Sequence, residues 1–173
     1  MPASTTSPHD VAFQISRRVA APLTRVWHAY TELEPLMQWF GPSGFSMPFS
    51  HFDFRPGGTF HHCLRTPTGF EMWGKWDFVS IDAPHSMSMV VTFSDAKGGL
   101  TRHPMSASWP LKVLSTTSFS TEGDQTLVTI VWEPHQATPD EVAAFRAAHA
   151  SMAQGCNSSF DQLDAYLAQL SPP

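Results

Sequence analysis

The 173-residue sequence is poor in charged side chains and has no long apolar run. Asp, Glu, Lys and Arg together make up 14% of the chain, against about 25% in a typical globular domain. No segment approaches the ~20 apolar residues that a transmembrane helix needs. The first ten residues lack the basic and apolar regions of a secretory signal. We therefore expect a cytoplasmic protein with no membrane partner.

Runs of basic residues are also missing. The formal net charge is -5 at pH 7. Proteins that bind nucleic acids gain much of their affinity from Lys and Arg side chains that neutralise phosphates. The sequence therefore predicts no nucleic-acid partner.

Cysteine is scarce, and the two cysteines predict neither a disulfide nor a metal site. Cys63 and Cys156 lie far apart with no CxxC spacing, which favours reduced, buried thiols. In the run His61-His62-Cys63, adjacent strand residues point to opposite faces, so His62 cannot share a site with its two neighbours. Two ligands are too few for zinc. We expect no metal and no cofactor.

The rest of the composition is that of a globular protein. Hydrophobic residues make up 42% of the chain, and a chain of this length can bury one core without disulfide or metal. Ser, Thr and Pro dominate residues 1–10, which we expect to be a disordered lead. Residues 11–173 are expected to form a single domain.

The first half of the chain predicts a strand, two short helices and then a series of hairpins. Apolar residues alternate over 13–19 as in a half-buried strand. Pro22 and Pro35 are placed to open short helices, and Gly41-Pro42 ends the second. Strand-like runs follow, separated by turn residues at 55–58, 67–69, 82–84, 97–99 and 122–124. Residues 94–110 are expected to be a long loop over an open end of the sheet.

The strongest local signal is the start of a C-terminal helix. Thr138 is placed as N-cap, Pro139 as first helical residue, and Glu141 to complete a capping box. Apolar residues then recur every three or four positions up to Ser171-Pro172, which predicts one helix of about 32 residues. Gly155 marks a candidate bend or close contact. The expected fold is α+β: a curved antiparallel sheet wrapped around the long helix, with two short helices after the first strand.

Several motifs resemble those of one known group of proteins. They are Ala21-Pro22 with Val26-Trp27, Trp39-Phe40-Gly41-Pro42-Ser43-Gly44-Phe45, Asp53-Phe54-Arg55-Pro56-Gly57-Gly58, Trp73-Gly74-Lys75-Trp76, Trp109-Pro110-Leu111 with Val113-Leu114, and Ser151-Met152-Ala153-Gln154-Gly155-Cys156. In this order they resemble the Bet v 1-like or START-like superfamily, and within it the SRPBCC proteins related to the C-terminal domain of the Hsp90 ATPase activator. The resemblance covers residues 11 to 170 and implies the helix-grip fold.

The resemblance implies three kinds of function. The leading hypothesis is binding of a small hydrophobic or aromatic molecule in a cavity between sheet and C-terminal helix, in a carrier, sequestration or stress-related role. One alternative is a cyclase-like or hydrolase-like enzyme that uses the same cavity; we favour the non-enzymatic function. The other alternative is a chaperone-associated protein-interaction module. Self-association as a homodimer is compatible with each.

The candidate cavity residues share an aromatic, sulfur-containing or imidazole side chain. They are Trp39, Phe45, Trp73, Trp76, Met89, Phe145, His149, Met152 and Cys156. His149 is interpreted either as a ligand-orienting or proton-transferring group or as a paired core histidine. No dyad or triad is visible, so no catalytic residue is assigned. The resemblance places Cys156 where the family pattern usually has Trp, which implies a larger or reshaped cavity.

Overall fold

The computed structural model describes residues 11–170, and the predicted disordered lead at 1–10 lies outside them. Within that range the strands are β1 (Phe13–Val19), β2 (Ser46–Phe52), β3 (Thr59–Arg65), β4 (Glu71–Asp82), β5 (Ser86–Ser94), β6 (Leu100–Thr101), β7 (Val113–Glu122) and β8 (Gln125–Pro134). The helices are α1 (Leu23–Thr31), α2 (Leu33–Trp39), α3 (Pro139–Ala147) and α4 (His149–Gln169).

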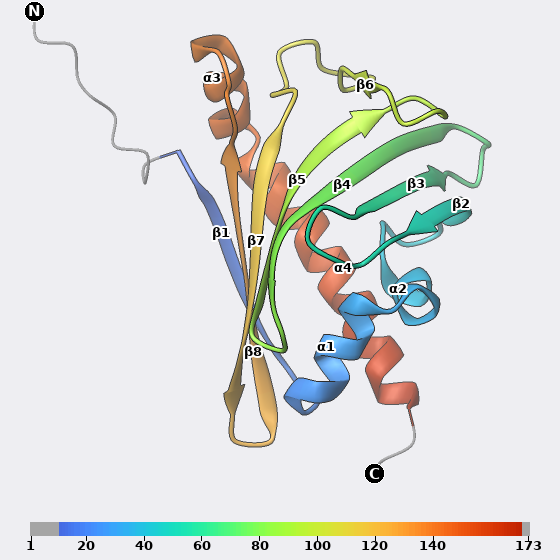
Figure 1. Ribbon diagram of the computed structural model, residues 1–173, viewed down its shortest axis with the longest axis vertical. Coiled ribbons are helices and arrows are strands. Elements are labelled where there is room, and N and C mark those ends of the chain that lie inside the picture. The colour runs from blue at the N-terminus through green and yellow to red at the C-terminus, as the bar shows by residue number, and fades with distance from the viewer. Residues whose placement is uncertain (1–10, 171–173) are drawn as a thin grey trace, which may run out of the picture.

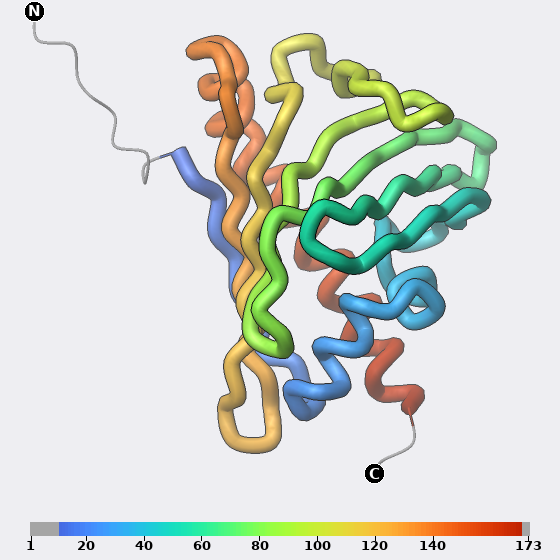
Figure 2. Tube along the Cα trace, viewed as in Figure 1, coloured from blue at the N-terminus to red at the C-terminus, as the bar shows by residue number. Residues whose placement is uncertain are grey.

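The strands form one antiparallel sheet in the order β1-β8-β7-β5-β4-β3-β2, with β6 paired to β5. The sheet curves around α4, and α1 and α2 lie at its lower end (Figure 1). The strands β1 and β2 follow one another in the chain yet form opposite edges of the sheet (Figure 2). The two short helices between them carry the chain from one edge to the other. The predicted α+β helix-grip fold is confirmed.

Each strand of the sheet presents alternate side chains to its two faces, which we call inner (toward α4) and outer. Antiparallel partners share a face, so the pair Phe60 and Trp76 lies on the inner face and the pair His61 and Lys75 on the outer. Phe60 belongs to the buried core, and Trp76 is partly buried and packs against it. The predicted hairpin turns separate β2 from β3, β3 from β4, β4 from β5, β5 from β6 and β7 from β8.

The C-terminal segment begins as predicted but is not one helix. Thr138 and Glu141 form the capping box at the start of α3. The helix then breaks at Ala148, whose φ of -93° and ψ of 1° leave the helical region, and α4 starts at the next residue. The break is not at Gly155, which lies inside α4, and a Cβ at that position would meet nothing within 4 Å. The prediction of a single continuous helix was wrong, because no Gly or Pro marks the break in the sequence.

The long segment between β5 and β7 is more ordered than a free loop. It contains β6 and an isolated bridge between His103 and Ser106. Arg102 Nη1 lies 2.5 Å from Glu141 Oε1 at the start of α3. This ion pair fastens the segment to the helix. Farther along the chain, Gln162 of α4 donates a hydrogen bond to the Gly41 carbonyl just beyond α2.

Candidate functional site

The inner face of the sheet carries two groups of aromatic rings. The first contains Phe60 of β3, Trp76 of β4 and Phe40 at the end of α2, whose ring centroids are 5.0 to 5.9 Å apart. The second lies where α3 meets α4 and is centred on Phe145. These rings are part of the core that joins sheet and helices. Together they make the space between the sheet and α4 strongly apolar.

His149 lies in the second group, between the rings of Phe13 and Phe145. The ring centroids are 5.6 and 5.5 Å from that of His149. Its Nε2 is 3.1 Å from the carbonyl oxygen of Val11. The imidazole thus has a backbone partner and ring neighbours, an environment typical of a paired core histidine.

Four other predicted cavity residues are buried between the sheet and the helices. Met89 comes from β5, Met152 and Cys156 from α4, and Trp39 from α2. Burial raises the pKa of the Cys156 thiol to about 12, so this sulfur is a neutral apolar group rather than a nucleophile. Trp39 Nε1 donates to the Ala29 carbonyl at 2.9 Å, which fixes the indole within the α1–α2 pair.

Two predicted cavity residues lie elsewhere. Trp73 is on the outer face of the sheet, where its ring centroid is 5.2 Å from Phe49 and 5.3 Å from His61. Trp73 and Trp76 are three residues apart in one strand, so a period of two places them on opposite faces. Phe45 lies in the connection between α2 and β2, outside both ring groups, and donates its N–H to the Pro42 carbonyl at 3.2 Å.

His62 is an inner-face residue that the candidate set omitted. Its side chain is 5% exposed, and its Nδ1 has no hydrogen-bond partner. The ring stacks on Phe60 with centroids 4.4 Å apart and meets Phe40 edge-on at 5.3 Å. Burial lowers the pKa of His62 to about 4, against a smaller raising effect of the Phe60 backbone, so the imidazole is neutral at pH 7. Leaving a buried polar atom unpaired costs about 1–3 kcal/mol.

Gly74 makes room for the His62 ring. The two residues are partners across β3 and β4, and a Cβ at position 74 would lie 2.9 Å from His62 Nε2. On its other side Gly74 pairs with Phe93 of β5. A glycine inside a strand often marks a place where another group comes close to the backbone. Here that group is a buried imidazole.

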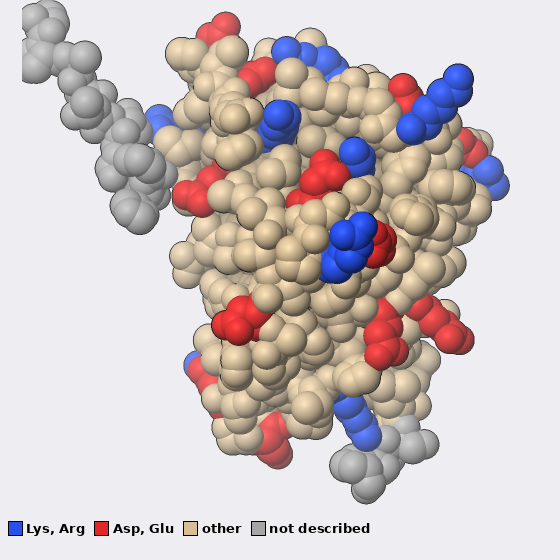
Figure 3. Space-filling model, in the orientation of Figure 1, with Lys and Arg blue, Asp and Glu red and all other residues tan. Residues whose placement is uncertain are grey.

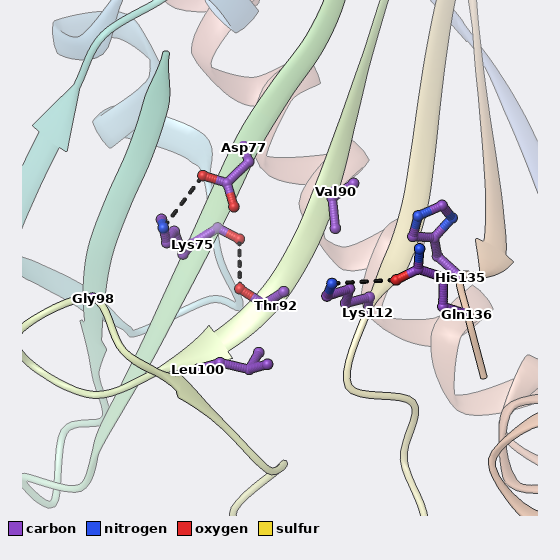
Figure 4. A pocket seen from close by; sticks show the side chains of 9 residues that line it. All are labelled: Lys75, Asp77, Val90, Thr92, Gly98, Leu100, Lys112, His135 and Gln136. Carbon is purple, nitrogen blue, oxygen red and sulfur yellow. Dashed lines mark hydrogen bonds and ion pairs between the residues drawn. The ribbon is translucent and has the colours of Figure 1, made fainter. Parts of the chain in front are cut away.

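The outer face has a hollow of about 330 Å³ between β4, β5 and the ends of β7 and β8. Figure 4 shows that its lysine side chains pair with neighbouring polar side chains. Lys75 Nζ lies 3.4 Å from Asp77 Oδ1, and Lys112 Nζ donates to Gln136 Oε1 at 3.3 Å. Charged groups of both signs are scattered over this side of the molecule (Figure 3). Because its lysines are already paired, the hollow is a weaker candidate than the inner face.

Residues 11–170 contain no group of three or more His, Cys, Asp and Glu side chains that could hold a metal ion. Cys63 and Cys156 are both buried free thiols. In the same range no helix is both long and apolar enough to cross a membrane.

The curved sheet, the helix that it encloses and the ring-lined inner face define a helix-grip α+β domain. The chain belongs to the family of activator of Hsp90 ATPase homolog 1-like proteins, whose model matches residues 20–168. The comparison with curated proteins gives no match.

Solved structures with the same fold come from several bacteria. A protein from Mycobacterium smegmatis is 23% identical, with 96% of each chain covered and a TM-score of 0.77. A protein from Arthrobacter aurescens is 23% identical, with 96% of this chain and 91% of that one covered and a TM-score of 0.77. The AHSA1 protein from Silicibacter pomeroyi is 15% identical, with 91% and 97% covered and a TM-score of 0.71. At these identities the likeness shows the fold alone.

Proposed function

We propose that this protein binds a small hydrophobic or aromatic molecule between the inner face of the sheet and α4, as a carrier or sequestering protein. One observation carries the proposal: small polar side chains stand at the centre of an otherwise aromatic and methionine-rich face. Ser115 and Thr117 are buried on β7, a central strand of the sheet. Ser115 Oγ accepts a hydrogen bond from Trp132 Nε1 at 2.9 Å, and Ser and Thr fill less volume at these positions than the large apolar side chains around them.

The lining is suited to an adaptable apolar ligand. Met87 and Met89 pair with Thr117 and Ser115 across β5 and β7, and Met152 is buried on α4. Methionine side chains are flexible and polarisable, so they rearrange around guests of different shape. Pockets that bind small molecules combine such apolar lining with a few polar groups.

A thermal-shift screen of the purified chain tests this proposal. The panel contains flavonoids, polyketides, fatty acids and aromatic acids. A ligand that binds only the folded state raises its stability by about 2.7 kcal/mol at a hundredfold excess over Kd. We expect a selective rise in Tm with one class of the panel.

Two tryptophan variants locate the binding site. Cys156→Trp places an indole in the space between α4 and the sheet and should abolish the shift in Tm. Gln154→Trp places the same indole on the exposed side of α4 and should leave the shift intact. A panel without any hit, or a hit that both variants retain, contradicts binding between sheet and helix.

A second candidate is a chaperone partner, which the family's name suggests. An exposed apolar side chain at the sheet edge favours it: Phe49 of the edge strand β2 is 41% exposed. Titration of purified Hsp90 with the unchanged chain and with Phe49→Ser would measure the affinity of each for the chaperone. Binding that Phe49→Ser weakens supports the interaction, and no binding by the unchanged chain excludes it.

A further inference from the structure

His62 is the most unusual polar group of the inner face. Its side chain is 5% exposed and its Nδ1 has no hydrogen-bond partner, although more than nine in ten buried polar groups in proteins have one. The fold nevertheless makes a place for this imidazole, because Gly74 leaves open the position that a Cβ would occupy 2.9 Å from Nε2. Any larger residue at 74 would push the ring away.

The neighbours of His62 on the inner face are aromatic. Its ring centroid lies 4.4 Å from Phe60, 5.3 Å from Phe40 and 6.1 Å from Trp76. The nearby charged side chain of Lys75 belongs to the opposite face, since it pairs with His61. A neutral imidazole nitrogen is therefore held among rings, on the face that the proposed ligand would contact.

We propose that His62 is the hydrogen-bonding anchor of the ligand site and that the ligand carries a neutral aromatic hydroxyl group, as phenols do. This inference rests on the proposed function. A phenolic hydroxyl both donates and accepts, so it can pair with Nδ1 in either imidazole tautomer. Its ring would pack against those of Phe40 and Trp76.

The same surroundings disfavour an anionic ligand at this position. An ionised carboxylate would have to leave water for a site without a cationic partner, which is costly. A purely apolar ligand would leave the Nδ1 atom unpaired. The hydroxyl is the group that satisfies His62 without bringing a charge into the core.

The test compares phenol with toluene, which has the same shape but no hydroxyl. Both are titrated into the full-length chain and followed by NMR. We expect phenol to bind about tenfold more tightly, as the pairing of one buried hydrogen bond implies. The ¹⁵N resonance of His62 Nδ1 should move with phenol and stay in place with toluene.

Variants show whether the preference for phenol comes from the His62 nitrogens or from the rings around them. In His62→Phe the ring is kept and the nitrogens are removed, so the preference for phenol should disappear while toluene still binds. His61→Phe is the matched control on the outer face and should keep the preference. If His62→Phe does not fold, His62→Gln and the ¹⁵N measurement on the unchanged chain decide instead.

The possible results are distinct. Equal binding of phenol and toluene, with the His62 nitrogens unaffected, overturns the anchor and leaves the proposed function standing. If neither compound binds and no compound of the thermal-shift panel raises Tm, both the His62 anchor and the proposed function are overturned. Retention of the phenol preference in His62→Phe also overturns the anchor.

Discussion

Two glycines of this chain have opposite surroundings, and alanine at each position reveals the difference. A Cβ at Gly74 would lie 2.9 Å from His62 Nε2, whereas one at Gly155 would meet nothing within 4 Å. We expect Gly74→Ala to lower the free energy of unfolding by about 1–3 kcal/mol through overpacking. Gly155→Ala in α4 should raise it by about 0.5–1 kcal/mol. Urea denaturation of both variants measures these changes, and a neutral Gly74→Ala would contradict the described packing.

Protonation of His62 should weaken the fold in mild acid. The pKa of His62 falls from 6.5 to about 4 on burial, so between those values the unfolded chain binds a proton that the native chain does not. Stability that is present above pH 6.5 is therefore lost as the pH falls toward 4, by at most about 3 kcal/mol.

His62→Phe should remove this part of the pH dependence. Carboxylates with lowered pKa values, such as Glu141 beside Arg102, titrate in both proteins and cancel in the difference. Unfolding free energies are compared at pH 7 and pH 4.5. An equal loss in both proteins would show that His62 titrates normally.

The sequence predicts which side chains of a strand share a face of the sheet. Alternation correctly separates His62 from His61 and Cys63, and it also separates Trp73 from Trp76. What the sequence does not contain is the identity of the inner face for β3 and β4, because both faces carry aromatic side chains. Alternation allows only one of Trp73 and Trp76 to face the cavity, and the structure places Trp76 there together with His62.

At the scale of single elements, the capping box of α3 is the clearest link between sequence and stability. The Glu141 N–H donates to Thr138 Oγ1 at 3.3 Å, and the Thr138 N–H donates to Glu141 Oε2 at 3.0 Å. Thr138→Ala should cost about 1 kcal/mol. Thr24→Ala, at an exposed position of α1, is the control and should be close to neutral. Thermal unfolding distinguishes the two.

The segment from β5 to β7 is attached to α3 by an ion pair and by the Trp109 ring, whose centroid lies 5.5 Å from that of Phe145. The Glu141 side chain is 8% exposed, and Arg102 Nη1 also donates to the Trp109 carbonyl at 3.4 Å. Arg102→Ala should therefore speed amide hydrogen exchange over residues 100–109 by about tenfold or more relative to β7 and β8. Lys97→Ala in the same segment should leave exchange unchanged. Equal protection in both variants would contradict the attachment.

Helix ends were predictable where capping residues, proline or charged residues mark them in the sequence. The start of α3 has an N-cap, a proline and an acidic first turn, and it was predicted to the residue. The break at Ala148 has no such signal. It coincides with tertiary contacts of the next residue, because His149 reaches the Val11 carbonyl, and a partner 138 residues away cannot be read from local spacing.

For the whole molecule, the order of elements was enough to predict the architecture. A strand, two short helices, a meander and a long amphipathic helix leave one arrangement in which the helix stripe covers the apolar face of the sheet. The sequence does not determine how closely the helix approaches the sheet at each point. That distance depends on how side chains interdigitate, and it decides where a ligand fits.

Arg17 links the edge strand β1 to α4. Arg17 Nη1 lies 2.9 Å from Asp164 Oδ2 and 3.1 Å from Asp161 Oδ1, and its guanidinium is 5.3 Å from the centroid of the Phe160 ring. Arg17→Ala removes these contacts together with the packing of the side-chain stem.

We expect Arg17→Ala to destabilise the fold by about 1–3 kcal/mol, while Arg18→Ala, on the outer face of β1, should cost at most about 1 kcal/mol. The Arg18 guanidinium pairs with Glu122 at 2.6 Å and is 66% exposed. Unfolding is followed by far-UV circular dichroism for the helices and by tryptophan fluorescence for the core. If helix and sheet form one cooperative unit, both signals of Arg17→Ala shift to lower denaturant together. Separate transitions would show that α4 detaches before the sheet unfolds.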